Sequence, residues 1–519
     1  MSMKLRFRAL AALVFALAGS TAVGATFHVT RGDDPPPNGC LPDDCSLREA
    51  IVDTATTPEA DTITLGAGQF QVWNSELVIT RAITIRGAGS GATRIISIDD
   101  FPILHVVPFG ELTLEGLEIS SSDGVAMVVT DNGTATLRDV HIPGGFSGVG
   151  TESSSSGAPS GSLRIEDSSI ESFVVCYQTD GVCRLFDSDT RFVLAHGELE
   201  LKRVVIDGDG TDLFGLSLQS MQPATIEDST IRNSGRPFYV RAASNDVAPP
   251  IHVRRTRFVD NFGPLVSDRA SYIHMDDVEF RDNVVSDAHV ADPAVLLAGP
   301  GPAWFISRAL VVGNRGGNTL DGAVIRVLGG GRAIFDNTTF DDNTFRDAPI
   351  FGHTIGVYNS TATPALLWLI HATMRRALTL DEATVGSLLT VRGPNTDVRL
   401  GNTALHGTCA FSGGGAIVQG IGNAEASDTC GLDEATNLVG LDPSELGLGD
   451  LADHGGFTDS FYPTRVSHLV DAADPAFCGF VGPLDQRAYV RPLDGIDCDI
   501  GAVEIDALSD SIFADGLEG

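Results

Sequence analysis

The sequence predicts an all-β protein whose main part is a right-handed parallel β-helix, a solenoid with one coil per repeat. Three observations lead to this prediction. A short apolar pattern recurs eleven times between residues 112 and 405, most copies carry a turn-forming residue at the same place, and successive copies lie about 22 to 36 residues apart. One copy cannot bury its own apolar face, whereas a stack of copies can.

The repeat is clearest in Ile273 to Asn283, where two alternating apolar residues are followed by a bend and a further apolar anchor. Alternate residues of a strand point to one face. The anchors are Ile119, Ile142, Ile170, Ile206, Ile231, Phe258, Phe280, Val311, Phe340, Met374 and Leu405. The residues seven and five positions before each anchor are also apolar. We therefore expect the anchors to lie above one another in one interior.

The residue three positions before the anchor suits a sharp bend in most copies. It is Gly116, Asp139, Asp167, Asp228, Asp277, Asn337 or Asn402 in seven of them. These residue types tolerate a left-handed backbone. The other four copies carry Arg203, Arg255, Arg308 and His371, which weakens the pattern. A β-sandwich of short strands, the alternative, does not require the same bend in the same register.

A recurring asparagine follows several anchors at a fixed distance. Asn261, Asn283, Asn314 and Asn343 each lie three residues after an anchor. Side-chain amides at one corner of stacked coils can bond from coil to coil, because the coils are about 4.8 Å apart. The pattern predicts an asparagine ladder.

Residues 1–25 are typical of a signal peptide. Lys4, Arg6 and Arg8 precede the apolar stretch 9–18, and small residues end the leader at Ala25. No later stretch predicts a transmembrane segment. The net charge of −34 argues against nucleic acid or anionic lipid as a partner. We expect an exported monomer that is secreted or held at a bacterial cell surface.

The eight cysteines form four close pairs in the sequence. The pairs are Cys40 and Cys45, Cys176 and Cys183, Cys409 and Cys430, and Cys478 and Cys498. An even number of cysteines in an exported chain indicates local disulfides. A metal–thiolate site is the alternative, but the usual C-x-x-C spacing is missing.

Residues 26–80 are expected to cap the first coil. Ser46 and Glu49 have the spacing of a capping box, which predicts a short helix over the open end. The stretch C-S-L-R-E-A-I, Cys45 to Ile51, resembles the N-terminal motif of the CSLREA-domain family of secreted bacterial proteins. Asp61 to Leu65 and Ile83 to Gly89 are similar to that family's first coils. The resemblance implies the same parallel β-helix fold.

The solenoid is expected to span residues 81–421, because the repeat stops at Gly422. Four stretches of residues 422–505 resemble the choice-of-anchor Q C-terminal module: Ser427 to Leu432, Leu451 to Gly456, Asp485 to Arg487, and Cys498 to Glu504. Ala488 and Val503 depart from that family, which usually has Gly and Phe there. The resemblance implies attachment to the cell envelope. Residues 506–519 form an acidic tail.

Stacked aspartates are the best local candidates for chemistry. Asp260 and Asp282 lie two residues after consecutive anchors, and Asp342 repeats the position. Carboxylates on adjacent coils can bind Ca²⁺ or separate their pKa values for acid and base catalysis, with Arg281 or Arg232 nearby. The alternative is that they are turn residues that bond to the local backbone.

Two weaker patterns point to metal binding. His252 and His274 recur six residues before their anchors, on the outward side of the strand, where two imidazoles can bind a metal. Asp207, Asp209 and Asp212 lie in a Gly-rich run without EF-hand spacing, so Ca²⁺ is the one cofactor that the sequence suggests.

The absence of a catalytic motif favours a non-catalytic exported surface or extracellular protein, which binds carbohydrate or another surface protein through its side loops. The alternative is a polysaccharide lyase or glycoside hydrolase that acts on an acidic polysaccharide through Asp260, Asp282 and Arg281.

Overall fold

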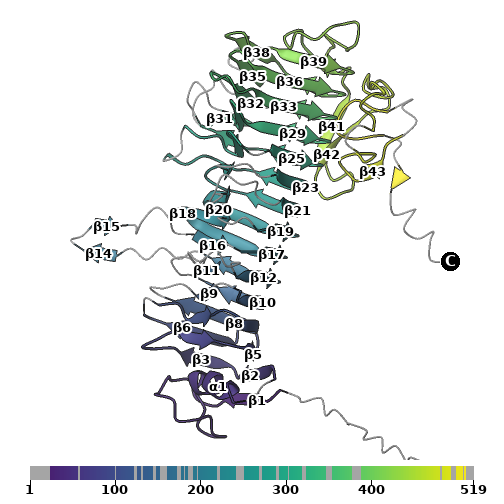
Figure 1. The fold of residues 1–519 in the computed structure, drawn as a ribbon. Coiled ribbons are helices and arrows are strands. Elements are labelled where there is room, and N and C mark those ends of the chain that lie inside the picture. Colours follow the sequence, from purple (N-terminus) through teal and green to yellow (C-terminus); the bar gives the residue numbers. More distant parts are fainter. Residues whose placement is uncertain are drawn as a thin grey trace, which may run out of the picture.

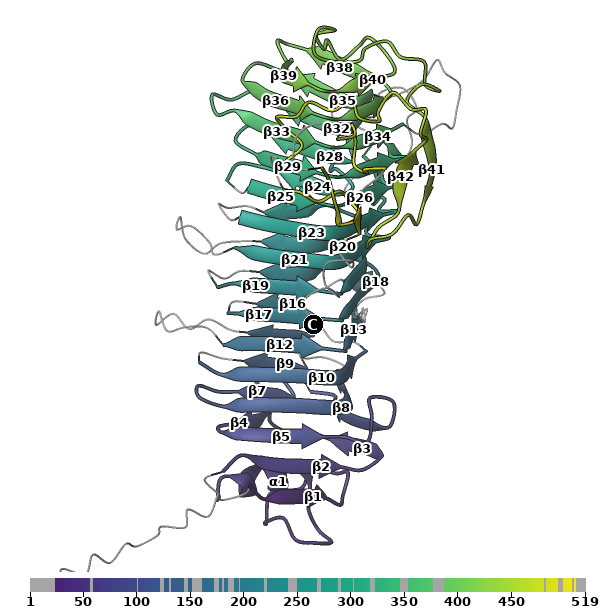
Figure 2. The ribbon, with the colours of Figure 1, turned by 90° about the vertical axis from the view of Figure 1, so that its right-hand side faces the viewer.

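Over its described residues, the computed structural model shows an all-β chain, a long stack of parallel strands with one α-helix (Figures 1 and 2). It describes residues 24–509 except 57–58, 100, 122–125, 130–131, 144–147, 152–160, 172–176, 180–181, 185–190, 196, 219–221, 241–249, 268–271, 288–290, 302, 318–322, 346–352, 377–386, 480–481, 493–497 and 506–507. The predicted signal peptide and most of the acidic tail lie outside the described residues.

The strands of the solenoid form three rows, and each strand pairs in parallel with its equivalent in the next coil. The first row consists of β1 (Thr26–Val29), β2 (Asp61–Leu65), β5 (Ala82–Arg86), β8 (Glu111–Ser121), β10 (Thr134–Ile142), β12 (Ser162–Glu166), β17 (Leu199–Lys202), β19 (Ala224–Glu227), β21 (Ile251–Val259), β23 (Tyr272–Arg281), β25 (Ala303–Ser307), β29 (Arg332–Asp336), β33 (Ala365–Ile370), β36 (Thr396–Gly401) and β39 (Ile417–Ile421).

The second row begins after the bend that follows each first-row strand. It consists of β3 (Gly68–Gln71), β6 (Thr93–Ser97), β13 (Ser169–Glu171), β18 (Val205–Leu218), β20 (Thr230–Val240), β26 (Leu310–Val312), β30 (Thr339–Asp341), β34 (Thr373–Arg375), β37 (Ala404–His406), β40 (Ala424–Glu425) and the second halves of β8, β10, β21 and β23.

The third row closes each coil. It consists of β4 (Leu77–Ile79), β7 (Leu104–Val106), β9 (Met127–Val129), β11 (Val149–Thr151), β16 (Arg191–Ala195), β22 (Leu265–Ser267), β24 (Leu296–Ala298), β28 (Ile325–Leu328), β32 (His353–Tyr358), β35 (Ser387–Arg392), β38 (Cys409–Ser412) and the ends of β18 and β20. Short pairs outside the rows are β14 (Tyr177–Thr179) with β15 (Val182–Arg184) and β27 (Arg315–Gly316) with β31 (Thr344–Phe345).

The predicted common interior is confirmed. Phe258 pairs with Phe280, Phe280 with Val311, and Val311 with Phe340, each directly above the last. The Phe258 and Phe280 rings stack with centroids 5.2 Å apart, and the anchors are buried. Each buried anchor contributes about 1.5–3 kcal/mol to stability.

The predicted bend is also confirmed, and in every copy. All eleven residues three before the anchor have positive φ, from 45° at Arg255 to 62° at Gly116. Copies without Gly, Asp or Asn at this position have the same left-handed backbone, since φ is 55° at Arg203, 52° at Arg308 and 48° at His371. We call these eleven positions the corner column.

The asparagine ladder is present as predicted. The backbone N–H and the side-chain Nδ2 of Asn261 both donate to Oδ1 of Asn283, at 2.9 and 3.0 Å. Asn283 donates in the same way to Asn314, and Asn314 to Asn343. Each second Nδ2 proton bonds a backbone carbonyl, for instance that of Phe258 at 3.0 Å from Asn283. These buried amides are therefore satisfied and hold four coils in register.

The N-terminal helix α1 (Leu47–Thr54) begins at Ser46 with the predicted capping box, in which Ser46 and Glu49 bond each other's backbone N–H groups. It packs against β1, β2 and β4 at the open end of the stack. Three of the predicted disulfides are present, Cys40–Cys45, Cys409–Cys430 and Cys478–Cys498. The fourth prediction, Cys176–Cys183, lies outside the described residues. Within the described ranges, no helix has the length and apolar character needed to span a bilayer.

Residues 422–505, here called the C-terminal module, turn back along the side of the upper coils (Figures 1 and 2). They contain the hairpin β41 (Leu448–Ala452) with β42 (Ser460–Pro463), and β43 (Tyr489–Val490) pairs with β44 (Leu508–Ser509). The module lies on the second row, where Arg281 bonds Asp459 at 3.1 Å and Arg375 stacks on Phe461 at 4.3 Å. This part of the second row is therefore covered, while the first row beside it keeps an open face.

Candidate functional site

The outward side of the first row carries a column of rings and cations. In each strand the residues that point inward are buried, as Ile273 and Met275 are in β23, so their neighbours point out. The strand register aligns six outward residues of successive coils: His252, His274, Phe305, Ile334, Trp368 and Arg399. We call this surface the outer face of the first row.

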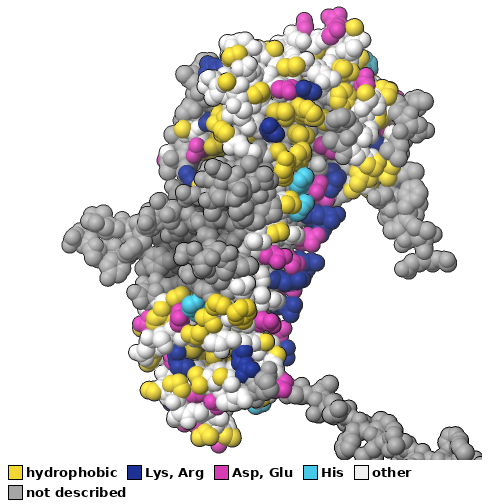
Figure 3. Space-filling view, viewed as in Figure 1, with side chains coloured by type: hydrophobic (Ala, Val, Ile, Leu, Met, Phe, Trp, Pro, Cys, Tyr) yellow, Lys and Arg dark blue, Asp and Glu magenta, His cyan; other side chains and the backbone are white. Residues whose placement is uncertain are grey.

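The rings of this column are in contact. His252 and His274 stack with centroids 5.3 Å apart, and His274 stacks on Phe305 at 4.9 Å. Tyr272, which is 49% exposed, also stacks on Phe305, at 6.3 Å. Figure 3 shows histidine and hydrophobic side chains together on this face, above a strip where basic and acidic groups alternate. Tyrosine, imidazole and phenyl rings thus form one solvent-facing platform.

Charged groups flank the platform on its next outward position. Arg254 is exposed and aligns with Asp276, which aligns with Ser307 and then with Asp336. Asp276 Oδ1 lies 3.4 Å from Nη2 of Arg308. Tyr272 and His274 of β23 and the exposed Arg254 one coil below, which aligns with Asp276, therefore lie on the same face, and we call these three residues the patch.

Two titratable groups of the first row have shifted pKa values: His274 in the patch, and Asp336, which is buried two coils further on. Burial lowers the pKa of His274, and the neighbouring His252 lowers it further, while Asp276 acts in the opposite direction. His274 is therefore a neutral imidazole at neutral pH, which is the form that accepts a proton. Burial raises the pKa of Asp336 to about 7, and its Oδ1 has no hydrogen-bond partner among the described residues. Such shifts are typical of functional sites.

The predicted aspartates lie at a second bend, between the second and third rows. Asp260, Asp282 and Asp342 all have positive φ, at 55°, 54° and 48°. This backbone explains why Asp recurs there without any ligand. The pKa of Asp282 is raised, mainly by burial, although Arg281 opposes the shift. Their catalytic or Ca²⁺-binding role stays a prediction.

The arginines named with those aspartates are already engaged. Arg281 pairs with Glu279 and, at 3.1 Å, with Asp459 of the C-terminal module. Arg232 pairs with Asp207 at 2.6 Å. The structure thus joins Arg281 to the module rather than to Asp260, although the Arg281 charge still acts on Asp282.

The structure places the predicted Ca²⁺ ligands in β18. Asp207 accepts hydrogen bonds from Arg232 at 2.6 Å and from Asn233 Nδ2 at 2.8 Å. The side chains of Asp209 and Asp212 lie outside the described residues. Across the described part of the chain, no group of three or more His, Cys, Asp or Glu side chains is arranged to hold a metal ion. Ca²⁺ binding therefore also stays a prediction.

Sequence reasoning recognised His252 and His274 as an outward pair but missed Tyr272, Arg254 and Asp276. The available signal was the register itself. Aligning the copies on their anchors puts Phe305 and Trp368 in the same column as the two histidines, and a column of rings on exposed positions is unusual for a solvated strand.

No protein-family model matches the chain, and no curated protein sequence matches it. Among solved structures, the A-module of the mannuronan C-5 epimerase AlgE4 of Azotobacter vinelandii is 12% identical, with a TM-score of 0.39, over 75% of this chain and 94% of that one.

Two further structures are similar to a lesser degree. The catalytic domain of a GH87 α-1,3-glucanase in complex with nigerose is 12% identical, with a TM-score of 0.35, over 73% of this chain and 67% of that one. The Agl-KA catalytic domain is 14% identical, with a TM-score of 0.32, over 70% of this chain and 61% of that one.

These comparisons correct one prediction. The sequence favoured a non-catalytic surface protein for adhesion or recognition, whereas the similar structures include an epimerase and a glucanase that act on polysaccharides. That prediction was wrong. It rested on the lack of a short catalytic motif, but in a solenoid the reacting groups come from different coils and need not form a motif.

Proposed function

We propose that the chain is an enzyme that acts on an acidic polysaccharide, and that it cleaves the chain beside a uronate by β-elimination. The observation that carries the proposal is the patch of Tyr272, His274 and Arg254 on the outer face of the first row. It places a proton acceptor, a proton donor and a cation on one open surface. These are the three groups that such a reaction needs.

In this proposal His274 takes the proton from the carbon next to the uronate carboxylate. The electron pair left on that carbon forms a double bond to the neighbouring carbon, and the glycosidic C–O bond there breaks. The Tyr272 hydroxyl gives its proton to the leaving oxygen. Arg254 faces the carboxylate and stabilises the negative charge that builds up on it before the bond breaks.

The face also has the length that a polymer requires. Its rings and cations extend over the coils from β21 to β36, and aromatic surfaces pack well against the C–H face of a sugar ring. The chain carries a net charge of −34, so it repels a polyanion at long range. Local contacts with Arg254 and the imidazoles must supply the attraction, and moderate salt should screen the repulsion more than it weakens those contacts.

The finer points of the fold and location belong to the same proposal. We infer that the coils wind in a right-handed sense, as parallel crossovers generally do. We also infer export to an oxidising compartment, which the three disulfides support. The family resemblances at both ends of the chain agree with that location, and they remain predictions.

The test is incubation of the purified protein with a panel of uronate polymers and neutral glucans. We expect ultraviolet absorbance from the new C=C bond with at least one uronate polymer. His274→Ala should lower the rate about 10²- to 10⁴-fold, whereas the control Arg138→Ala, an outward residue of the same row in a lower coil, should not. No new absorbance with any uronate polymer would reject the proposal.

A further inference from the structure

A pocket of about 210 Å³ lies at the upper end of the outer face of the first row, between the solenoid and the C-terminal module. Its walls are mostly apolar and include Trp368, Ile370 and Leu400 from β33 and β36, and Phe477 from the module. Arg399 and Gln419 lie at its polar side. None of these residues belongs to the patch of Tyr272, His274 and Arg254.

The pocket depends on a close approach between the module and β36. A Cβ atom at Gly401 would lie only 2.8–3.0 Å from the ring of Phe477. The bare backbone of Gly401 therefore lets the Phe477 ring lie directly against the strand. A larger residue there would push the ring away and change the wall of the pocket.

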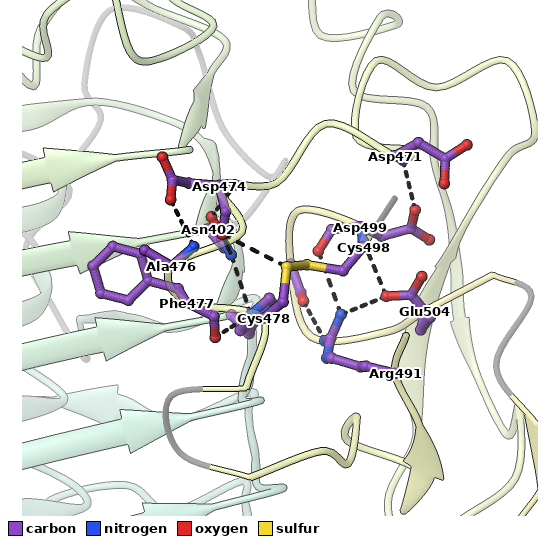
Figure 4. Close-up of a disulfide and its surroundings, with 12 residues drawn as sticks. Asn402, Asp471, Asp474, Ala476, Phe477, Cys478, Arg491, Cys498, Asp499 and Glu504 are labelled. Atoms are coloured by element: carbon purple, nitrogen blue, oxygen red, sulfur yellow. Dashed lines mark hydrogen bonds and ion pairs between the residues drawn. A yellow bond between two sulfur atoms is a disulfide. The ribbon is translucent and has the colours of Figure 1, made fainter. Parts of the chain in front are cut away.

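The segment that carries Phe477 is fixed from both sides (Figure 4). Asn402 accepts a hydrogen bond from the Asp474 N–H at 2.7 Å and donates one to the Asp474 carbonyl at 3.0 Å. Cys478 is bonded to Cys498, and the Phe477 carbonyl lies 3.2 Å from Nε2 of His371. The aromatic wall is thus held in place before any ligand arrives.

Charge in the pocket is balanced within the protein. Arg399 stacks on the Trp368 ring at 4.9 Å, and Asp397 holds its guanidinium through two hydrogen bonds of 2.7 and 3.0 Å. The pocket therefore offers aromatic faces and a neutralised guanidinium rather than a free cation. This chemistry suits the apolar C–H face of a sugar ring, whose hydroxyls can reach Arg399 and Gln419.

We propose that this pocket is a distal sugar-binding subsite that takes one pyranose ring of the same polysaccharide chain. Trp368 is in the column of His274 and three coils further on, about 14 Å away. Only an oligosaccharide covers that distance. The inference rests on the proposed function for the identity of the polymer, and it gives the C-terminal module a role, because the module supplies one wall.

The experiment compares short and long oligosaccharides of one uronate polymer, with binding measured by calorimetry on the full chain. Trp368→Ala and Phe477→Ala should weaken binding of the long oligosaccharides about 10-fold and leave binding of disaccharides unchanged. Trp368→Tyr, which keeps an aromatic face, should restore most of the affinity. Trp73→Ala, at an exposed tryptophan near the N-terminus, is the matched control.

The outcomes separate this inference from the proposed function. Length-dependent binding that vanishes in Trp368→Ala supports the subsite even where no cleavage occurs. If the protein cleaves the polymer but Trp368→Ala binds long oligosaccharides as tightly as the parent chain does, the subsite is overturned. The proposed function is then unaffected. Tight binding of a fatty acid or detergent probe, in place of oligosaccharides, would also overturn it. Melting curves of the variants show whether each is folded.

Discussion

The residues of the corner column share one backbone conformation, but their side chains differ between two regions of the solenoid. From the coil of β12 to that of β25 its residues are charged, are exposed or half-buried, and alternate in sign: Asp167, Arg203, Asp228, Arg255, Asp277 and Arg308. Each arginine bonds the aspartate of the coil below, for example Arg255 to Asp228 at 2.6 Å. In the upper coils the residues are Asn337, His371 and Asn402, which the C-terminal module covers and which are at most 2% exposed.

The left-handed bend does not by itself determine which residue type occupies the corner column. The residues of both regions have φ within 45° to 55°, so the strain of the left-handed backbone is the same. What differs is the surroundings. Exposed positions take charges that pair between coils, whereas covered positions take uncharged polar groups that bond to the module, because an unpaired buried charge costs too much.

The largest loss of stability is expected in the covered region, on removal of the Arg491 guanidinium. Arg491 is about 1% exposed, donates to Asn337 Oδ1 at 2.9 Å and pairs with Glu504 at 2.9 Å. Arg491→Ala leaves these groups without their partner, and we expect a loss of about 3–5 kcal/mol in the free energy of docking the module. Trypsin cleavage within residues 422–505 and a lowered melting temperature would report it. Unchanged proteolysis would contradict the role given to Arg491.

The second expected effect is a pH dependence confined to the covered region. Burial raises the pKa of Asp336 and of Glu504 to about 7, from 3.8 and 4.5. Arg491 acts against both shifts, and Arg308 acts against that of Asp336. A raised pKa in the folded state means that the folded chain, with the module docked, binds the protons of Asp336 and Glu504 more tightly than the unfolded chain does. The stabilisation is therefore complete below about pH 4 and is lost as the pH rises to about 7.

The size of this pH effect should be on the order of a few kcal/mol. Melting curves from pH 4 to 8 measure it, and the module should release first at the higher pH. Asp336→Asn should flatten part of the curve, because an amide does not titrate. Release that becomes easier toward acid pH would show the sign to be wrong.

The smallest effect is expected in the exposed region. Arg203 lies on the surface and bonds Asp167 at 2.7 Å. Exposed ion pairs contribute about 0–1 kcal/mol and are screened by salt. Arg203→Ala should therefore lower the melting temperature only slightly, and by less still in high salt. A loss equal to that of Arg491→Ala would remove the distinction between the two regions.

Much of the fold was readable from the sequence because each coil repeats the same local physics. The anchors and the bends depend on spacing within a few residues, and so does the Asn261 to Asn343 ladder. Even the arginines at the corner, which weakened the pattern, follow a rule that the sequence contains. Successive copies of the repeat form adjacent coils, so an arginine in one copy lies beside the aspartate of the preceding copy and pairs with it.

The site was harder to predict because it depends on neighbours that are distant in the sequence. Tyr272 and Asp276 were not singled out from the sequence, since a single strand gives no sign of which side chains of other coils its outer face meets. The contact of Arg491 with Asn337 joins residues 154 apart in the chain, and the Phe477 wall likewise comes from outside the repeat. No local spacing encodes such contacts.

The unbroken backbone register from His274 through Phe305 to Ile334 makes the length of this surface modular. Adding one whole coil, for instance by duplicating residues 303–331, would extend the platform by a single step of about 4.8 Å and preserve the pairing above and below. Insertion of whole coils can therefore increase the distance between the patch of Tyr272, His274 and Arg254 and the distal pocket without redesign of either one.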